Sequence, residues 1–379
     1  MLDYVTLKII WWVLVGVLLI GFAIMDGHDM GVGTLLPFVG KGDTERRVVI
    51  NTVAPHWDGN QVWFITAGGA VFAAWPLIYA TAFSGFYWAM MAVLWSLFFR
   101  PVGFDYRSKI ENKIWRQTWD WGLFVGGFIP PVIFGVAFGN LLQGVPFYFD
   151  ENLLVHYTGS FWALLNPFAL LAGLVSSAMI TFHGAIYLML RTEGDIHRRA
   201  KIAANIFGIL ALGLFAIAGI WVAKGIGGYA IVGNYDISAL PNPLDKQVTH
   251  QTGAWMQNYS KMPITMAIPA LAFISGIIAI FLAKIEKAGA AFVFSSLMMA
   301  GIIGTAGISM FPFLMPSSSN PNSSLMVWDS ASSHLTLGIM FWAVVIFMPI
   351  IIIYTSWAYK VMSGKVTKNY IEDNKHSVY

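Results

Sequence analysis

Apolar residues form long runs along this chain, and short polar stretches separate them. The first run, 7–25, is long enough at 1.5 Å per helical residue to cross a membrane core of about 30 Å. The run at 62–99 is too long for one crossing, and Pro76 divides it because proline ends a helix. The pattern predicts nine transmembrane helices, at about 7–25, 56–74, 76–99, 119–142, 161–190, 202–223, 264–283, 288–315 and 335–359.

Basic residues segregate between the predicted connectors. Of the 22 Lys and Arg, 18 fall on one side, and only Lys8, Lys224, Lys246 and Lys261 fall on the other. Because cytoplasmic loops of membrane proteins are enriched in Lys and Arg, we expect the C-terminus in the cytoplasm and the N-terminus outside. The chain would then be a single transmembrane domain, 1–379, with an extracytoplasmic loop at 224–263 and a cytoplasmic tail at 360–379.

Composition agrees with this pattern, since 57% of the residues are hydrophobic and only 11% are charged, against about 25% charged in soluble domains. We expect an all-α, polytopic integral membrane protein, with two four-helix bundles and one peripheral helix. The absence of cysteine excludes disulfides and thiolate ligation of haem or iron–sulfur centres within the chain. Walker, zinc-protease, serine-hydrolase and dinucleotide motifs are missing, and nucleic acid is not an expected partner.

Two polar clusters lie next to apolar runs, at 26–33 and 55–61, and the helix count places both on the cytoplasmic side. In the first, Asp26 and Asp29 share one helical face if the helix continues through Gly27, and they could then hold a shared proton. The alternative is two solvated carboxylates at a helix end. Glycines at 27, 31 and 33 would allow another helix to approach closely.

The second cluster places Asp58 between His56 and Asn60, at the mouth of an apolar segment. Ionisable groups at the hydrocarbon boundary cost several kcal/mol, so they usually face a protein interior and have a function there. We expect a polar pocket around Asp58, with Asp58 as a titrating group. A carboxylate at the start of a helix is the structural alternative.

Two further residues allow more than one interpretation. Arg100 follows an apolar run directly, so it either extends to lipid headgroups or pairs with a carboxylate or a haem propionate. His183 lies late in a predicted helix and could ligate a haem iron. No second helical His or Met pairs with it in an obvious way, which favours a hydrogen-bonded core histidine.

Several short motifs follow one another along the chain: 26–33 (DGHDMGVG), 56–63 (HWDGNQVW), 84–87 (SGFY), 99–101 (FRP), 103–107 (GFDYR), 139–147 (GNLLQGVPF), 311–318 (FPFLMPSS) and 328–333 (WDSASS). Together they resemble subunit II of the cytochrome bd quinol oxidase from the first helix to Tyr379. The resemblance departs at His28, where the family pattern has phenylalanine.

The resemblance implies a heterodimer whose larger subunit I holds two b-type haems, one haem d and the quinol-oxidising loop. This chain would be haem-free, without catalytic residues or metal ligands of its own. The complex would oxidise ubiquinol or menaquinol in the bacterial inner membrane, reduce oxygen to water with cytoplasmic protons, and charge the membrane without pumping. A small accessory subunit, lipid and a structural quinone are further implied partners.

Residue by residue, the resemblance implies a proton path through Asp58, Asp29, Asp26 and His56. Trp57 and Trp63 would form a wall facing oxygen or haem. One alternative is a proton-coupled transporter using Asp58, although the pattern has no inverted repeat and no matched pair of broken helices. Another is a subunit that carries haem in its own right.

Overall fold

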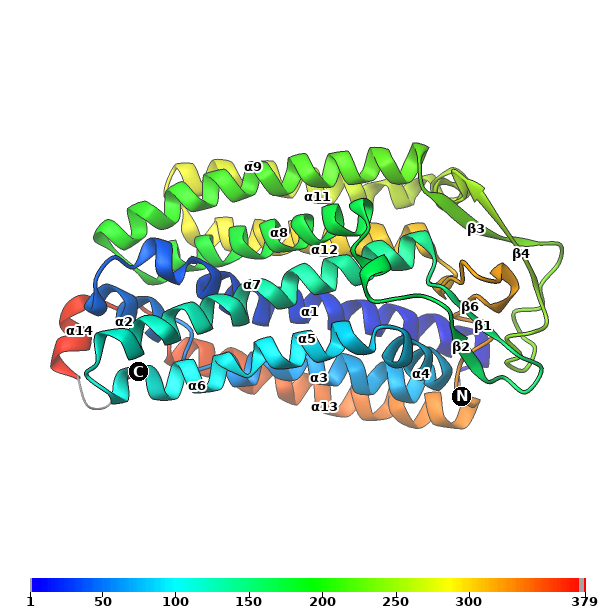
Figure 1. Ribbon diagram of the computed structural model, residues 1–379, viewed down its shortest axis with the longest axis horizontal. Helices are drawn as coiled ribbons and strands as arrows, with labels where there is room; N and C mark the ends of the chain where they lie inside the picture. The colour runs from blue at the N-terminus through cyan, green and yellow to red at the C-terminus, as the bar shows by residue number, and fades with distance from the viewer. Residues whose placement is uncertain (1, 375–377) are drawn as a thin grey trace.

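Long helices lie side by side along the longest axis of the molecule, and short strands gather at one end (Figure 1). The computed structural model describes residues 2–374 and 378–379. Residues 1 and 375–377, the latter part of the predicted tail, lie outside the described residues. Most of the described chain is helical, as the sequence predicted.

Seven helices of the described residues are long and apolar enough to cross a membrane. They are α1 (Tyr4–Val39), α7 (Lys113–Gln143), α8 (Pro167–Arg191), α9 (Gly194–Lys224), α11 (Ala267–Lys284, with the preceding turn), α12 (Ala288–Met310) and α13 (His334–Val361). Helix α4 (Pro76–Gly85) and the segment 87–109 form a pair that is bent by 81°. If this pair is one span, the number of candidate spans rises to eight. The prediction of a helix break at Pro76 is confirmed, whereas the bend after Gly85 was not predicted.

The remaining long helix, α3 (Trp57–Ala74), is apolar mainly in its second half, because Asp58, Asn60 and Gln61 lie in its first turns. The other elements are short. They are α2 (Asp43–Asn51), α5 (Tyr87–Leu97), α6 (Phe99–Tyr106), α10 (Gln257–Lys261), α14 (Lys368–Asp373), and the antiparallel pairs β1–β2 (Phe147–Phe149, Val155–Tyr157), β3–β4 (Gly227–Val232, Gln247–Thr252) and β5–β6 (Phe313–Met315, Leu325–Met326).

The predicted end of the first helix, at residue 25, is wrong. Helix α1 continues for 36 residues to Val39, about 54 Å at the usual rise, and it carries Asp26 and Asp29 inside the helix. The helix continues because both carboxylates find polar partners from other elements, which removes the cost of burying them. The predicted helix at 288–315 is also too long, since α12 ends at Met310 and residues 313–315 form β5.

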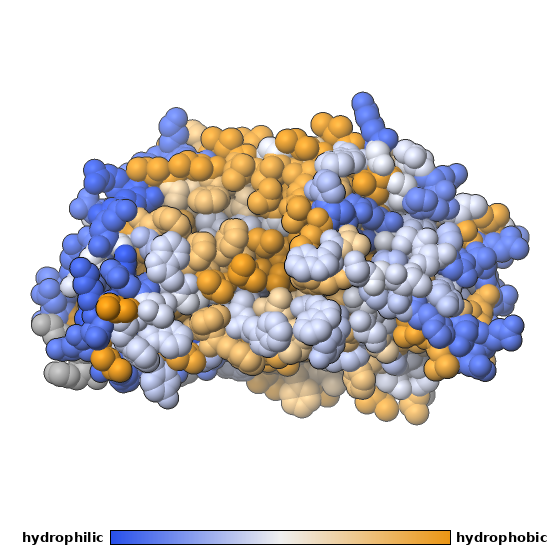
Figure 2. All heavy atoms as spheres, viewed as in Figure 1, coloured by the Kyte–Doolittle hydropathy of each residue, from blue (hydrophilic) through white to orange (hydrophobic). Residues whose placement is uncertain are grey.

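On the face of the molecule that Figure 2 shows, polar residues cover the two ends, and the broad middle is mainly apolar. One end carries α2, α6 and α14, and the other carries the strands and the N-terminus (Figure 1). An apolar belt between polar ends is what a bilayer requires of a helical bundle. We call the end that carries α2 the α2 end, and the end that carries the strands the strand end.

At the strand end, the segment 224–263 is held by the pair β3–β4 and by a buried ion pair. Lys246 lies 2.6 Å from the Asp329 carboxylate, and both side chains are fully buried. Burial raises the pKa of Asp329, and burial lowers the pKa of Lys246. The nearby Lys8 ammonium donates to the Trp328 carbonyl at 2.9 Å, which ties α1 to the same loops.

Helix α8 forms the centre of the bundle and packs against α1, α7, α9 and α12. Its residues from Val175 to Met189 are buried without a break. Gly31 of α1 and Gly184 of α8 meet here, because a Cβ at Gly31 would lie 2.3 Å from the Ile180 carbonyl oxygen and one at Gly184 would lie 2.5 Å from the Gly31 backbone. The predicted close approach of another helix is therefore confirmed at Gly31.

Replacing Gly184 with valine should prevent assembly, because the new side chain meets backbone that cannot move away without separating α1 from α8. We expect the yield of assembled, membrane-extracted protein to fall at least about fivefold by size-exclusion chromatography, since about 1 kcal/mol is already a factor of five in a two-state population. The matched control is Gly213→Val on α9, where nothing lies within 4 Å of a Cβ. Equal yields of the two variants would contradict this packing.

At the α2 end, Glu45 joins three separate segments. It accepts hydrogen bonds from Arg199 of α9 at 2.7 Å, from Lys368 of α14 at 3.1 Å and from the Lys41 amide at 3.1 Å. Burial opposes its ionisation, but these hydrogen bonds outweigh burial and lower the pKa of Glu45 from its ordinary value of 4.5 to about 2. The ionised carboxylate is therefore part of the folded structure.

A carboxylate whose pKa is lowered by folding stabilises the protein above its unfolded pKa, and that stability is lost as the pH falls. Glu45→Gln should therefore lower the thermal midpoint of unfolding at pH 7. The corresponding loss in the free energy of unfolding is at most about 3 kcal/mol, at 1.36 kcal/mol per pKa unit. The difference from wild type should shrink as the pH falls from about 4.5 towards 2. Glu193→Gln, which removes an exposed carboxylate at the same end, should show no such pH dependence. A pH-independent Glu45 difference would contradict the assignment.

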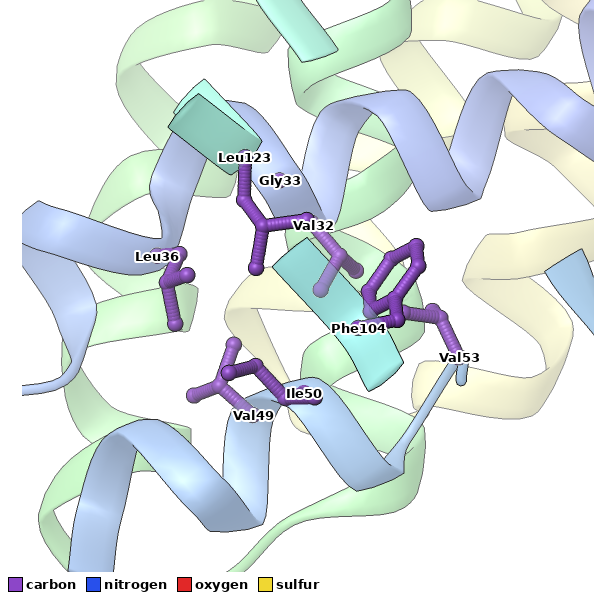
Figure 3. A pocket seen from close by; sticks show the side chains of 8 residues that line it. All are labelled: Val32, Gly33, Leu36, Val49, Ile50, Val53, Phe104 and Leu123. Carbon is purple, nitrogen blue, oxygen red and sulfur yellow. The ribbon is translucent and has the colours of Figure 1, made fainter. Parts of the chain in front are cut away.

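A small apolar void lies between α1, α2, α6 and α7 (Figure 3). Its volume of about 10 Å³ approaches that of one water, but every lining side chain is apolar. It is lined by Val32, Gly33, Leu36, Val49, Ile50, Val53, Phe104 and Leu123. Because a water needs two to four polar partners, this void stays dry and offers water no route along this part of α1.

Candidate functional site: a buried carboxylate and histidine centre

The buried polar centre begins with Asp26 of α1, which forms a two-pronged ion pair with Arg100 of α6. Arg100 donates Nη1–H to Oδ2 at 2.8 Å and Nη2–H to Oδ1 at 2.5 Å. Both side chains are at most 2% exposed, and the Arg100 guanidinium also stacks 5.4 Å from the centre of the Trp57 ring. Parallel Arg–carboxylate hydrogen bonds combine geometric specificity with strength. Arg100 therefore pairs with a carboxylate of this chain, and that carboxylate is Asp26 rather than Asp58.

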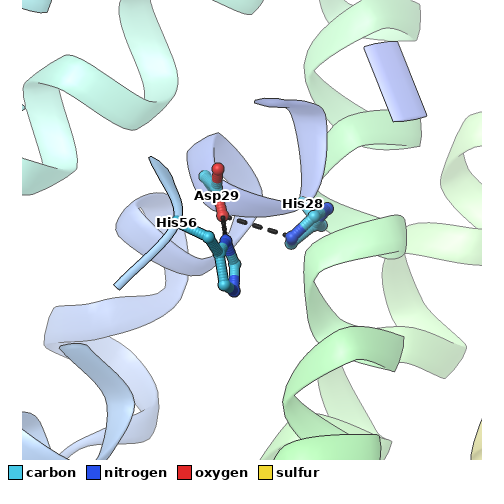
Figure 4. Close-up of side chains that lie close together, drawn as sticks. All are labelled: His28, Asp29 and His56. Atoms are coloured by element: carbon cyan, nitrogen blue, oxygen red, sulfur yellow. Dashed lines mark ion pairs between the residues drawn. The ribbon is translucent and has the colours of Figure 1, made fainter. Parts of the chain in front are cut away.

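Asp29 lies almost one turn further along α1 and is also buried. Its Oδ2 accepts from the Asn60 side-chain amide at 2.7 Å, and Arg100 Nη2 is 4.0 Å away. Its Oδ1 faces two imidazoles, with His28 Nε2 at 3.2 Å and His56 Nδ1 at 3.7 Å (Figure 4). Among the residues that the structure describes, neither Asp29 Oδ1 nor His28 Nε2 has an aligned hydrogen-bond partner.

Two tyrosines complete the outer part of the centre. The Tyr187 hydroxyl of α8 lies 2.9 Å from His56 Nε2, and the Tyr359 hydroxyl of α13 donates to Asn60 Oδ1 at 2.8 Å. We call Asp29, His28, His56, Asn60, Tyr187 and Tyr359 the Asp29 centre. Its side chains come from α1, α3 and its preceding turn, α8 and α13, so four separate segments meet at one carboxylate.

The expectation of a polar pocket around Asp58 is wrong for this chain. Asp58 is exposed in the first turn of α3, and its carboxylate accepts only the amide of Gly59 among the hydrogen bonds of the described residues. His56 and Asn60 instead face Asp29, because residues four apart share a helix face and the residue between them points away. Asp58 lies at the α2 end. In sequence it is two residues from both His56 and Asn60, the partners of Asp29.

The other predicted residues are placed as follows. His183 is a buried core histidine with Nδ1 2.7 Å from Ser295 Oγ and Nε2 3.1 Å from the Ile24 carbonyl oxygen, which confirms the structural interpretation. With both ring nitrogens engaged, His183 does not fit as a haem ligand. Trp57 is half-buried over Arg100, and half-buried Trp63 packs against Gly21 of α1.

Sequence reasoning missed Tyr187 and Tyr359. Tyr187 follows His183 by four residues on α8, so the spacing could have placed it on the same buried face. Tyr359 lies near the end of α13, a helix that is otherwise largely exposed, and no local pattern distinguishes it from an interfacial tyrosine.

The Asp29 centre can hold a cation. The His28 and His56 rings each direct one nitrogen toward Asp29 Oδ1. If neither nitrogen carries a hydrogen, all three atoms are hydrogen-bond acceptors and no hydrogen bond can form between them. A proton held between these groups resolves the conflict, and hydroxyl and amide partners connect them to further polar atoms. Such a buried and nearly satisfied network is suited to exchanging protons.

Comparisons with known proteins indicate which family the chain resembles. The family model for cytochrome bd terminal oxidase subunit II matches residues 7–362. The chain is 59% identical to cytochrome bd-I ubiquinol oxidase subunit 2 of Escherichia coli (strain K12), and the match covers 100% of both. It is 33% identical to cytochrome bd ubiquinol oxidase subunit 2 of Bacillus subtilis (strain 168), over 94% of this chain and 96% of that protein.

A chain of the solved bd oxidase from Geobacillus thermodenitrificans has the same fold, with a TM-score of 0.68 at 13% identity, over 95% of this chain and 98% of that chain. The alternative of a proton-coupled transporter gains no support, because the described residues contain one bent helix pair rather than a matched pair. With a family match across nearly the whole sequence, this chain belongs to the cytochrome bd terminal oxidase subunit II family.

Proposed function

We propose that this subunit conducts protons from the cytoplasm toward the oxygen-reducing site of a quinol oxidase. Family membership supports the setting, since the Escherichia coli relative is named a ubiquinol oxidase subunit. In that setting the complex oxidises ubiquinol or menaquinol, reduces oxygen to water and charges the membrane without pumping. The observation that carries the role of this chain is Asp29, a buried carboxylate joined by hydrogen bonds to groups near the α2 end.

The topology that goes with this role has nine spans, in two four-helix bundles and one peripheral helix, with α3 crossing the membrane beside α1 and α13. Contacts of α3 with both helices support it. The segregation of basic residues puts the α2 end in the cytoplasm, with the tail 360–379, and the N-terminus and the loop 224–263 outside. The whole chain, 1–379, is then one transmembrane domain of the bacterial inner membrane.

The haems b and d belong, in this proposal, to the partner subunit I, and this chain is haem-free. The hydrogen bonds at both nitrogens of His183 support this. Trp57 and Trp63 are proposed to face the oxygen-reducing site. A structural quinone is proposed as well, and a groove of about 520 Å³ beside Trp88 and Trp162 has the size and aromatic lining such a ring needs. Lipid and a small accessory subunit complete the proposed partners.

The proposed route begins at exposed Asp58, passes His56 and Asn60, and reaches Asp29. The hydrogen bond from Asn60 to Asp29 at 2.7 Å, and the contact of His56 Nδ1 with the Asn60 amide at 3.1 Å, support its inner part. Asp26 contributes through Arg100, because their ion pair places a balanced pair of charges beside Asp29. The side chains of His56 and Asp29 can each take up and release a proton, which a relay through a low-dielectric interior requires.

Asp58→Asn tests the entry of this route, because it keeps the shape of the side chain and removes the exchangeable proton. Quinol-driven oxygen consumption of the assembled complex should fall at least about tenfold, or about 1.4 kcal/mol on the limiting barrier. Asp58→Glu should retain more activity than the amide. Asp195→Asn, which removes an exposed carboxylate at the same end, should respire like wild type. Wild-type respiration of Asp58→Asn with an intact haem spectrum would mean that Asp58 only begins the helix.

A further inference from the structure

Three potential metal ligands converge inside the Asp29 centre. His28 Nε2, Asp29 Oδ1 and His56 Nδ1 all lie within 4.8 Å of one another (Figure 4). Their residues are 0%, 1% and 7% exposed. His28 Nε2 and Asp29 Oδ1 are buried atoms without a hydrogen-bond partner among the described residues, and both point into the space between the three groups.

The hydrogen bonds around the two imidazoles determine which nitrogens are free to bind a cation. His28 Nδ1 lies 3.0 Å from the Ile24 carbonyl oxygen, which can only accept, so Nδ1 carries the hydrogen and Nε2 has a free lone pair. His56 Nε2 lies 2.9 Å from the Tyr187 hydroxyl and 3.2 Å from the Thr52 carbonyl oxygen. Because the Tyr187 hydroxyl donates its own hydrogen to that carbonyl, Nε2 carries a hydrogen and the lone pair is on Nδ1. Metal-bound histidines usually donate their other ring N–H to a carbonyl or carboxylate in this way.

We propose that His28, Asp29 and His56 form a binding site for a divalent transition-metal cation, with zinc as the ion that fits the ligand set best. Two imidazoles and a carboxylate are a common set of three protein ligands for zinc, and the fourth position is then open to water. Harder ions such as magnesium prefer oxygen ligands throughout, which this centre does not offer.

The two separations from Asp29 Oδ1 need little adjustment, whereas His28 Nε2 and His56 Nδ1 lie within 4.8 Å of each other and have to approach as the ion binds. Ligand atoms about 2.0–2.1 Å from a tetrahedral ion lie about 3.3 Å apart. The distance between His28 Nε2 and Asp29 Oδ1 is already 3.2 Å, and the 3.7 Å between His56 Nδ1 and the same oxygen has to close by a few tenths of an ångström.

The Asn60 amide must turn to admit the ion. Its Nδ2 now donates to Asp29 Oδ2 and lies 3.1 Å from His56 Nδ1. Half a turn of the amide presents Oδ1 instead, a further oxygen ligand, and directs Nδ2 toward the Tyr359 hydroxyl that Oδ1 contacts now. The turn removes the Asn60 donor from Asp29 Oδ2, and the nearest remaining donor to that oxygen is then Arg100 Nη2, 4.0 Å away.

Two guanidinium groups bring positive charge near the centre. Arg100 faces Oδ2 of Asp29 rather than the ligand oxygen Oδ1, and Asp26 balances its charge. Arg191 lies on the outer side, 6.0 Å from the centre of the Tyr187 ring. Asp29 supplies one negative charge to the ion. Because Asp29 and His56 also form the proposed proton route, a bound zinc ion would compete with protons there, so the expected inhibition of respiration rests on the proposed function.

Zinc content of the whole purified complex tests the site without relying on activity. The complex is stripped with a chelator, equilibrated with Zn²⁺, desalted and analysed for zinc per haem. Wild type should retain one zinc more per complex than His28→Phe. The phenyl ring retains the packing of the imidazole against Tyr187, whose ring centre lies 4.2 Å away, and His28→Leu serves as a second variant. The control His250→Phe removes an exposed imidazole at the strand end and should match wild type.

X-ray absorption on zinc-loaded wild type needs no variant and should show nitrogen and oxygen ligands at about 2.0–2.1 Å with scattering from imidazole rings. Equal zinc in wild type and both His28 variants, or a zinc spectrum without imidazole, would overturn the proposal. If zinc binds as expected but oxygen consumption continues at the zinc-free rate, the metal site stands and the proton route through Asp29 is contradicted instead.

Discussion

Oxygen consumption should fall at least about thirtyfold when Asp29 is replaced by asparagine, a larger loss than at Asp58. Water can carry part of the proton flow past an exposed group such as Asp58, whereas Asp29 is 1% exposed and apolar side chains line the adjacent part of α1. Asparagine has nearly the same shape and can accept the Asn60 hydrogen bond, but it cannot hold a proton in exchange. A thirtyfold loss corresponds to about 2 kcal/mol on the limiting barrier.

The measurement is quinol-driven oxygen uptake by the purified complex, normalised to its haem content. A matched control is Asn51→Asp, since this buried amide at the α2 end bonds to the Tyr379 backbone and takes no part in the Asp29 centre. That control should change stability but should leave the turnover of assembled complex within about threefold of wild type. Turnover of Asp29→Asn within the same range would exclude Asp29 from the route.

Arg100→Met should prevent accumulation of the complex, because it leaves the Asp26 carboxylate buried without its partner. Removing one member of a buried ion pair costs about 3–5 kcal/mol, and the Arg100 guanidinium also stacks on Trp57. Haem-containing complex in membranes should fall at least about tenfold. Removing the charge of Asp26 as well should restore much of it, so Asp26→Asn combined with Arg100→Met should accumulate better than Arg100→Met alone.

This rescue separates an ion pair from two independent effects, because independent substitutions would add their costs. Arg116→Met is the matched control, since Arg116 pairs with the partly exposed Asp43 at the same end and surface pairs contribute about 0–1 kcal/mol. A double variant that accumulates less than Arg100→Met would contradict the pairing.

Apolar runs predicted the helical fold well, but local sequence could not predict where α1 ends. Asp26 and Asp29 normally indicate that a membrane helix has ended, and here they continue it because Arg100, 74 residues away, and Asn60, 31 residues away, pair with them. The partners of a buried charge come from tertiary packing, and a hydropathy pattern contains no information about them. The short strand β5 was assigned to a helix for the same reason, because its partner β6 comes later in the chain.

The sequence named several residues of the candidate site, but it did not predict how their side chains are arranged. The sequence singled out the polar stretch around residue 58 with Asp58 as its buried group, but the buried members of that stretch are His56 and Asn60, while Asp58 is exposed. Helical geometry could have indicated this, since positions 56 and 60 share a face that position 58 does not. Tyr359 could not have been found, because only the packing of α13 against α1 and α3 brings it to Asn60.

Proton uptake during a single turnover tests the central claim most directly. A pH-sensitive dye in a weakly buffered medium follows protons taken up by the reduced, detergent-solubilised complex after it is mixed with oxygen, while haem absorbance follows oxygen binding. In wild type, uptake should keep pace with the oxygen chemistry. In Asp29→Asn, oxygen should bind at the wild-type rate and proton uptake should be delayed at least about thirtyfold. Proton uptake at the wild-type rate in that variant would contradict a route through Asp29.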